Sequence, residues 1–253
     1  MWCQPPAYPT VTDQSATELQ RRQFTDRLFN EAAPHYDRIN RLIAFGVGAW
    51  YRRWALSRAG LRPGMTVLDI GIGTGAVARA AARLVGPSGR IVGLDPSIGM
   101  LTQAAQQLRM PVIQGVAEGL PFRDATFDFL SMGYALRYVA DLRATFAECH
   151  RVLRPGGTLL ILDLARPRTR AGYYLARFYL DMAIPWMARF GSGSKESQLL
   201  VNYCWTTIDR AIPSETIHAS LAACGFDHLR RTLWVGLLSE QVAVKSGGLP
   251  AGG

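Results

Sequence analysis

The sequence predicts an α/β protein with a mostly parallel sheet, because short apolar segments alternate with helical patterns. In the clearest unit, between residues 66 and 100, an apolar segment at Val67 and Leu68 leads into a glycine-rich loop. An alanine-rich helical pattern follows, and a second apolar segment at residues 90–94 ends at Asp95. This order indicates parallel strands joined by right-handed crossovers, as in a Rossmann-like fold.

The remaining segments continue this alternation. Residues 21–54 are expected to form helical pieces, broken at Pro34 and around residues 46–48. The residues RPGG at 154–157 predict a tight turn. The other predicted elements are helices at 96–108, 142–153 and 214–223, strands at 111–114, 127–132 and 158–162, and a closing hairpin of 229–235 and 241–245 around Gly236.

Length and composition fit one domain. The chain has 253 residues, of which 49% are hydrophobic, so we expect a single well-buried domain over residues 21–245. Residues 1–20 and 246–253 are expected to be flexible. Residues 166–210 are the least regular, and their aromatic side chains predict either a helical lid over an apolar pocket or a helix packed on the sheet.

The absence of targeting signals and the spacing of cysteines favour a cytoplasmic protein. No apolar segment reaches the roughly 20 residues of a spanning helix. The N-terminus lacks the basic start and apolar core of a secretory signal. Cys3, Cys149, Cys204 and Cys224 are widely spaced, with no CxxC pair. We therefore expect reduced, structural cysteines and no metal site.

The formal net charge of +9 raises the question of a nucleic-acid partner. Lysine occurs only at Lys195 and Lys245, so the positive charge comes almost entirely from arginines spread along the chain. No basic block or aromatic-basic RNA motif is present, and we expect no nucleic-acid partner. Dispersed arginines suit solvated helix faces, anionic membrane surfaces or acidic substrates.

The glycine loop and the acid that follows it indicate a cofactor that contains adenosine. Gly71, Gly73 and Gly75 let the backbone approach a ligand closely, and the start of the next helix favours negative charge. Asp95, at the end of the second strand, can accept hydrogen bonds from both ribose hydroxyls. The alternative is a tight turn without a ligand.

Two cofactors fit this loop. Gly71, Gly73 and Ala76 satisfy the dinucleotide fingerprint G-x-G-x-x-G/A. Asp69 extends the motif to D-x-G-x-G-x-G, the pattern of class I methyltransferases, which use S-adenosylmethionine (SAM). A carboxylate there suits an amino group and a sulfonium cation and repels a pyrophosphate. We therefore favour SAM and keep the dinucleotide as the alternative.

Several further segments match one family. They are YDRINRLI at 36–43 followed by Phe45-Gly46, AEGLPF at 117–122, Leu136-Arg137, and RVLRPGG at 151–157. Over about residues 24–245 the chain therefore resembles the ubiquinone/menaquinone C-methyltransferases, a branch of the class I SAM-dependent methyltransferases. The glycine loop and the RPGG turn are shared by many methyltransferases, so only the first segment and Leu136-Arg137 point to the quinone branch.

This resemblance implies a fold, a cofactor site and an acceptor. The implied fold is the Rossmann-like class I methyltransferase fold, with a seven-stranded, mostly parallel sheet, a C-terminal antiparallel hairpin, N-terminal helices over the cofactor and a helical lid insertion. The implied acceptor is a small lipophilic or aromatic molecule. The implied SAM-binding residues are Tyr36, Asp69, Gly71, Gly73, Thr74, Gly75, Asp95, Pro96, Met100, Ala117, Glu118 and Gly133.

The chain also departs from the family pattern. Val116 stands where the family usually has an Asn or Asp that contacts adenine, and Gly133 replaces a serine at the end of the fourth strand. Tyr138 replaces an Asn, while Asp163 and Ala165 replace a glutamate and a serine after the fifth strand. These departures suggest a divergent member that acts on a related lipophilic or aromatic acceptor.

Methylation of a ring carbon requires a base, or a water held by polar groups, near a neighbouring hydroxyl. By resemblance Arg137 faces the site, where its charge could stabilise a phenolate; the alternative is a helix-cap or surface arginine. Tyr138 and Tyr134 could add a phenol or simply pack. His35 could act as a base near neutral pH, or be a hydrogen-bonded loop residue in the helix break.

Together these features predict a SAM-dependent methyltransferase that C-methylates a quinone-like aromatic lipid. Two alternatives remain: an O- or N-methyltransferase of another small molecule, and a SAM-binding regulatory protein without turnover. The expected location is the cytoplasm. A peripheral contact at the inner face of a membrane and a homodimer are both left open.

Overall fold

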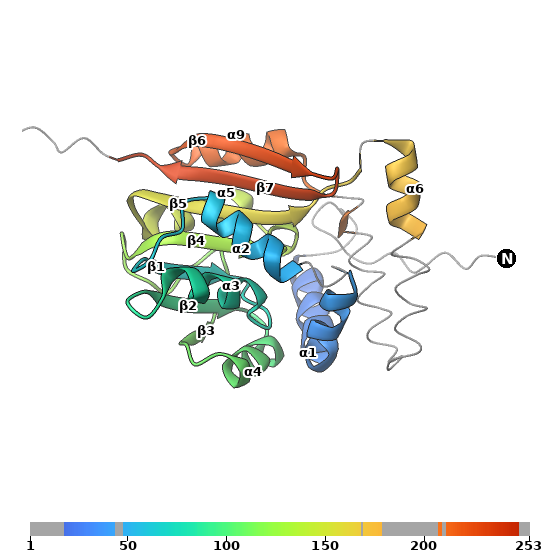
Figure 1. The fold of residues 1–253 in the computed structure, drawn as a ribbon, viewed down its shortest axis with the longest axis horizontal. Helices are drawn as coiled ribbons and strands as arrows, with labels where there is room; N and C mark the ends of the chain where they lie inside the picture. Colours follow the sequence, from blue (N-terminus) through green and yellow to red (C-terminus); the bar gives the residue numbers. More distant parts are fainter. Residues whose placement is uncertain (1–17, 44–47, 168, 179–206, 209–210, 248–253) are drawn as a thin grey trace, which may run out of the picture.

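Seven strands form one sheet in the computed structural model, which describes residues 18–43, 48–167, 169–178, 207–208 and 211–247 (Figure 1). The strands are β1 (Thr66–Ile70), β2 (Arg90–Asp95), β3 (Val112–Gln114), β4 (Phe127–Gly133), β5 (Leu153–Leu164), β6 (Phe226–Trp234) and β7 (Leu238–Lys245). Their order is β3-β2-β1-β4-β5-β7-β6. β1 to β5 pair in parallel, and β7 runs antiparallel to both β5 and β6. The predicted fold class is confirmed.

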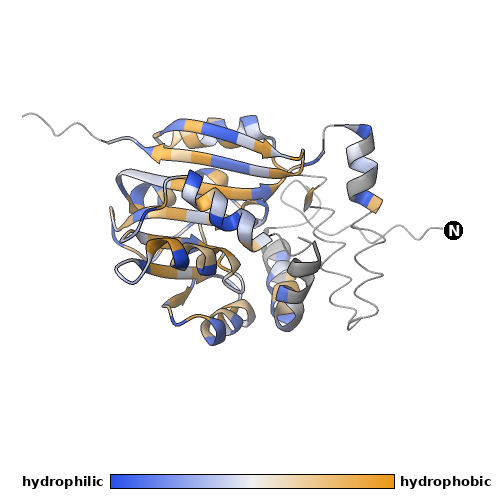
Figure 2. Cartoon of the chain, in the orientation of Figure 1, coloured by the Kyte–Doolittle hydropathy of each residue, from blue (hydrophilic) through white to orange (hydrophobic). Residues whose placement is uncertain are grey.

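Helices cover both faces of the sheet. They are α1 (Glu18–Ile43), α2 (Gly48–Arg58), α3 (Ala76–Val85), α4 (Ile98–Gln107), α5 (Leu142–Val152), α6 (Arg170–Phe178) and α9 (Ser214–Ala223), with a short 3-10 helix at Leu136–Tyr138. Alternate residues of β1 point to opposite faces, so Leu68 packs in the core under α5 and α9, and Val67 in the core under α2 and α3. In Figure 2 hydrophobic residues recur along the strands.

α1 differs from its prediction, because it runs through Pro34 without a break and begins at Glu18, inside the segment expected to be flexible. A proline inside a helix costs about 3 kcal/mol. Tertiary contacts offset this cost: Leu28 and Ala32 are buried, and Oδ1 of Asn30 accepts hydrogen bonds from Ser97 Oγ at 2.8 Å and Gly99 N at 2.7 Å, at the start of α4. His35 therefore lies within a helix and not in a helix break.

β5 is longer than predicted and contains the RPGG turn. Phe127 pairs with Leu153 and Phe129 pairs with Thr158, so the intervening residues bulge out of the strand. Gly156 has φ +77°, which only glycine adopts readily. The closing hairpin and the helix at 214–223 are confirmed, although β6 begins earlier than predicted, at Phe226.

Only part of the predicted lid can be compared with the structure. Its first part forms α6, while residues 179–206, which hold Trp186, Asn202, Tyr203 and Trp205, lie outside the described residues. No helix in the described part of the chain is long and apolar enough to cross a membrane. Over the same residues, no group of three or more His, Cys, Asp or Glu side chains could hold a metal ion.

Candidate active site

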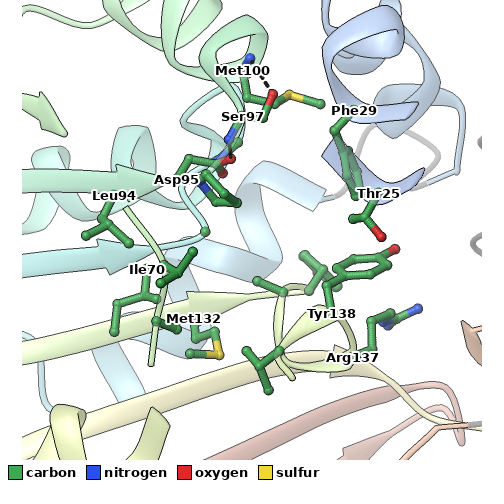
Figure 3. Close-up of a pocket in the computed structure, with 18 of the residues that line it drawn as sticks. Thr25, Phe29, Ile70, Leu94, Asp95, Ser97, Met100, Met132, Arg137 and Tyr138 are labelled. Atoms are coloured by element: carbon green, nitrogen blue, oxygen red, sulfur yellow. Dashed lines mark hydrogen bonds between the residues drawn. The ribbon is translucent and has the colours of Figure 1, made fainter. Parts of the chain in front are cut away.

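A cavity of about 250 Å³ lies at the carboxyl ends of the parallel strands, where the strand order reverses between β1 and β4. Its walls come from the ends of β1, β2 and β4, from the loops that follow these strands, and from α1. Figure 3 shows Thr25 and Phe29 of α1 on one side of this cavity and Leu94 and Asp95 on the other. Doubly wound sheets bind their ligands at this position.

The loop after β1 is shaped by glycines with a left-handed backbone. Gly71 has φ +66° and Gly73 has φ +55°, conformations that residues with a Cβ rarely adopt. A Cβ at Gly71 would lie 2.5 Å from Cβ of Ala135, whereas a Cβ at Gly73 would meet nothing within 4 Å. Because Gly73 lines the cavity, the space beside it can receive a ligand.

The N–H groups of this loop are bonded within the protein. Gly71 and Ile72 both donate to the carbonyl oxygen of Leu94, at 2.7 and 3.0 Å. Gly73 donates to Oδ2 of Asp95 at 2.8 Å. A pyrophosphate site instead offers such N–H groups to its ligand. The loop therefore gives a ligand room rather than donors, which argues against the dinucleotide alternative.

Asp95 ends β2 in the wall of the cavity and is 7% exposed. Its Oδ1 accepts the N–H of Ser97 at 2.9 Å and its Oδ2 accepts the N–H of Gly73 at 2.8 Å. Burial raises the pKa of this carboxyl to about 6, although both N–H donors act in the opposite direction. Each oxygen keeps a further lone pair, so two ribose hydroxyls can still donate to it.

Two more carboxylates lie in the cavity wall, on Asp26 of α1 and on Glu118. Oε1 of Glu118 accepts the N–H of Ala140 at 2.7 Å, which fixes the carboxylate beside the loop after β4. The negative charge of Asp26 contributes to the raised pKa of Asp95. Acidic walls attract a ligand with an amino group and a sulfonium more strongly than a phosphate. This charge pattern fits SAM.

Most of the predicted cofactor residues line the cavity. They are Tyr36, Gly71, Gly73, Asp95, Pro96, Met100, Ala117, Glu118 and Gly133. Arg137 and Tyr138, predicted as catalytic residues, line it too. Val116 also lines it and offers an apolar surface at the family's adenine-contact position. The side chain of His35 lies outside the described residues.

Asp69, Thr74 and Gly75, which were also predicted to bind the cofactor, are not among the residues that line the cavity. Thr74 is 1% exposed and its hydroxyl donates to the carboxylate of Asp37 in α1. Gly75 precedes α3 with φ +86°, and a Cβ there would collide with the Leu108 side chain. These residues lie on the side of the glycine loop that faces the protein interior, and the residues next to them form the cavity wall.

Asp69 ties β1 to β4 inside the protein. It is 1% exposed, and its Oδ1 accepts a hydrogen bond from Ser131 Oγ at 2.6 Å. Burial raises the pKa of Asp69 to about 7, against the opposing effect of the Ser131 hydrogen bond. Between about pH 4, roughly the ordinary pKa of an aspartate, and about pH 7, the folded protein therefore keeps Asp69 protonated, whereas the unfolded chain releases this proton.

Asp69→Asn should stabilise the protein at high pH relative to the unchanged chain. Because the folded-state pKa is raised, the stability that Asp69 contributes is lost as pH rises from about 4 to about 7. An amide does not ionise and can still accept from Ser131. Thermal melts should show the variant gaining roughly 2–3 kcal/mol between pH 5 and pH 8, or about 4–10 °C. Asp124→Asn, at a side chain that is 78% exposed, should show no such gain.

Two of the segments that match the family pattern, residues 36–43 and 151–157, hold the site together. Asp37, from the first segment, contacts Thr74 and also lies 3.4 Å from the Arg79 guanidinium in α3. Arg151, from the second, bonds Glu148 at 2.7 Å and the carbonyl oxygens of Leu120 and Phe122 at 3.0 and 2.8 Å. This arginine fixes the loop that carries Ala117 and Glu118 into the cavity wall.

Sequence reasoning missed several wall residues. On α1 these are Thr25, Asp26 and Phe29; elsewhere they are Ile70, Leu94, Ser97, Met132, Ala135, Val139 and Ala140. The ring of Phe29 packs edge-on against Tyr138 at 5.1 Å and Tyr36 at 6.1 Å. The spacing of Phe29 and Tyr36, seven residues apart on one helix face, is the signal that could have found Phe29.

Arg137 lies in the 3-10 helix after β4 and is 7% exposed. Its guanidinium pairs with the carboxylate of Asp163 at the end of β5, and Nη1 donates to Thr207 Oγ1 at 3.3 Å. Figure 3 shows Arg137 and Tyr138 at the side of the cavity away from Leu94. Arg137 is therefore neither a helix cap nor a surface arginine, but a fixed positive charge in the cavity wall.

Tyr134, which follows β4, also lines the cavity. It has φ +61°, a left-handed conformation that costs a non-glycine residue about 1 kcal/mol or more and is common at functional sites. The Arg52 guanidinium hydrogen-bonds its phenol, and the charges of Asp163 and Arg137 act on it. Burial raises the pKa of Tyr134, so the phenol stays neutral and can donate.

The switch-point cavity, the ligand space beside Gly73 and the acidic walls around Asp95 together define a class I SAM-dependent methyltransferase. The ubiE/COQ5 methyltransferase family model matches residues 16–245. The chain belongs to this family. The resemblance seen in the sequence is thereby confirmed.

Curated relatives cover most of the chain. The 2-phytyl-1,4-naphtoquinone methyltransferase of Thermosynechococcus vestitus is 34% identical over 86% of this chain and 97% of its own length. The demethylmenaquinone methyltransferase of Desulfitobacterium hafniense is 34% identical over 88% of each chain. A ubiquinone/menaquinone biosynthesis C-methyltransferase of Escherichia coli is 30% identical over 85% of this chain and 87% of its own length.

Solved structures share the fold at low sequence identity. A SAM-dependent methyltransferase from Aquifex aeolicus superposes with a TM-score of 0.60 at 19% identity, over 82% of this chain and 97% of that one. A Haemonchus contortus phosphoethanolamine N-methyltransferase bound to SAM gives a TM-score of 0.56 at 18% identity, over 78% of this chain and 53% of that one. These matches support the Rossmann-like methyltransferase architecture.

Proposed function

We propose that this methyltransferase acts on a ring carbon of a quinone-like aromatic lipid. The observation that carries the proposal is Arg137, a buried fixed charge in a cavity wall that also contains Phe29, Met132 and Val139. These apolar side chains suit an aromatic acceptor, and the Arg137 guanidinium beside them suits the phenolate that such an acceptor forms. The names of the cyanobacterial and Desulfitobacterium relatives support this class of acceptor.

The cofactor supplies an activated methyl group on a sulfonium, which is transferred in line to the acceptor. In this proposal Asp95 accepts the ribose hydroxyls, and the space beside Gly73 receives the adjacent part of the cofactor. Glu118 and the backbone at Ala117 contact the adenine, because Val116 has no polar group to do so. Tyr36, Pro96 and Met100 pack around the ligand, and α1 excludes water.

The acceptor is activated by the polar groups around Arg137. A ring carbon becomes nucleophilic when a neighbouring hydroxyl loses its proton. Asp163 and Thr207 hold the Arg137 guanidinium in place, so it can stabilise the phenolate without rearranging. We assign Tyr138 to the contact with the acceptor ring, and we keep His35 as the residue that accepts the proton, either directly or through water.

The location and assembly of the protein stay predictions. We expect it in the cytoplasm, with a peripheral contact at the inner face of a membrane that brings it to a lipophilic acceptor. A homodimer is compatible with the chain. The acceptor itself is a small molecule, and no nucleic acid takes part in the reaction.

A transfer assay tests the proposed function. The protein is incubated with labelled SAM and a panel of quinols, simple phenols and amines, and mass spectrometry locates the methyl group. Carbon methylation of a quinol is the expected result. Methyl groups found on oxygen or nitrogen would replace the proposal with the alternative enzyme. SAM binding without transfer to any of these compounds would favour a regulatory protein.

A further inference from the structure

The described residues include six large hydrophobic side chains that are exposed to solvent. They are Trp50, Ile98, Val116, Tyr174, Phe178 and Val235. Each lies in a helix, loop or turn at the carboxyl end of the parallel strands, where the cavity lies (Figure 1). Val116 lines the cavity itself. Exposed hydrophobic side chains gathered on one end of a protein indicate a contact surface.

An aromatic ladder forms the middle of this surface. Trp50 is 68% exposed and stacks on Trp54, with ring centroids 5.9 Å apart and an interplanar angle of 10°. Trp54 packs edge-on against Trp234 at 4.6 Å. Val235, in the turn between β6 and β7, is 89% exposed. The start of α2 and the tip of the hairpin therefore form one continuous patch.

α6 lies at the same end of the sheet (Figure 1). The hairpin tip is bonded to the segment after β5, because Ala165 N donates to the carbonyl oxygen of Leu237 at 2.7 Å. The Arg166 guanidinium then lies over the Tyr173 ring, 5.0 Å from its centroid. On α6, Tyr174 is 65% exposed and Phe178 is 58% exposed. We call the exposed residues of α2, the hairpin tip and α6 the docking face.

The charge of the docking face is positive. The sequences of α2, GAWYRRWALSR, and α6, RAGYYLARF, contain arginines and no acidic residue. Arg53 and Arg170 are exposed, while Arg58 is used inside the protein in an ion pair with the buried Glu240 at 3.2 Å. Tryptophan and tyrosine beside arginine are the side chains that favour the boundary between water and an anionic bilayer.

We propose that the docking face binds the surface of a bilayer that contains anionic phospholipid. In this arrangement the aromatic ladder and α6 enter the headgroup region, the exposed arginines meet lipid phosphates, and the cavity opens toward the bilayer. The inference deepens the proposed function and rests on it only for the claim that the acceptor arrives from the lipid. The surface itself follows from exposure, ring contacts and charge.

Sedimentation with vesicles tests this proposal. The full-length protein is mixed with vesicles of phosphatidylcholine alone, or with vesicles in which about a third of the lipid is phosphatidylglycerol. We expect binding to the anionic vesicles that is roughly 10- to 30-fold weaker in Arg53→Ala/Arg170→Ala. Trp50→Ala/Val235→Ser should weaken it about 10-fold. Unchanged melting temperatures and SAM affinities would show that both variants are folded.

The matched control removes the same charge from the opposite end of the sheet. Arg62 and Arg83 are exposed near the amino ends of β1 and β2, and Arg62→Ala/Arg83→Ala should bind vesicles like the unchanged protein. Equal losses in this control and in Arg53→Ala/Arg170→Ala would overturn the proposal. So would equal binding to both kinds of vesicle, or a preference for a single-stranded oligonucleotide over anionic vesicles.

The vesicle measurement contains no methyl acceptor, so its outcome does not depend on the outcome of the transfer assay. Loss of vesicle binding in the docking-face variants, with retained transfer to a short-chain, water-soluble acceptor, would support both proposals. Vesicle binding that does not depend on the docking face would overturn this inference alone. Failure of transfer in a protein that still binds vesicles through the docking face would overturn only the proposed acceptor.

Discussion

Arg137→Ala should lower the turnover rate by roughly 10²–10³ while the affinity for SAM stays within a few-fold. The guanidinium lies in the cavity wall and is fixed by Asp163 and Thr207, so it can act on the developing phenolate at no cost of rearrangement. Arg137→Lys should recover little of the rate, because a compact ammonium cannot keep both contacts. Single-turnover rates and SAM titrations on the same preparations measure the two quantities.

The ion pair complicates this experiment, since Arg137→Ala leaves the Asp163 carboxylate without its partner and can cost about 3–5 kcal/mol of stability. The double variant Arg137→Ala/Asp163→Asn removes the uncompensated charge and should melt at a higher temperature than Arg137→Ala. If Arg137 acts on the acceptor, the double variant stays slow. Near-normal turnover in the folded double variant would instead mean that Arg137 only anchors the loop after β4.

Asp95→Ala should weaken SAM binding by roughly 2–3 kcal/mol, or about 30- to 150-fold. Two effects add in this variant: the ribose loses its acceptors, and the N–H groups of Gly73 and Ser97 lose the carboxylate that orders the loop. Gly73→Val should be worse, because its side chain would fill the ligand space and its backbone would be strained at φ +55°. Calorimetric titration with SAM measures both variants.

Gly119→Ala provides a control for the second substitution. A Cβ at Gly119 also meets nothing within 4 Å, but this glycine does not line the cavity, so SAM affinity should hardly change. Unchanged SAM affinity in both Asp95→Ala and Gly73→Val would refute the assigned cofactor site. Binding of NADH without binding of SAM would restore the dinucleotide alternative.

The sequence predicted the architecture because the relevant signals are local. Apolar alternation and the glycine loop each specify backbone conformation over a few residues, and both appear in the structure where expected, whereas the RPGG segment forms a bulge inside β5 and not a separate turn. The prediction of a helix break at Pro34 was wrong because distant contacts outweighed a local signal. A proline penalty is local, but the burial of Leu28 and the bonds from Asn30 to α4 that outweigh it come from distant parts of the chain.

The same distinction between local signals and distant contacts applies to the residues of the functional site. The sequence by itself determined that Gly73, Asp95 and Arg137 belong to one cavity, because residues after parallel strands meet at one edge of the sheet. Only the tertiary structure decided that Asp69 faces Ser131 and not the cavity, and that Asp37 holds Thr74. It alone placed Phe29 and Asp26 in the wall and Asp163 on Arg137. A motif fixes which residue types stand near a strand end, but the direction of each side chain depends on packing between segments far apart in sequence.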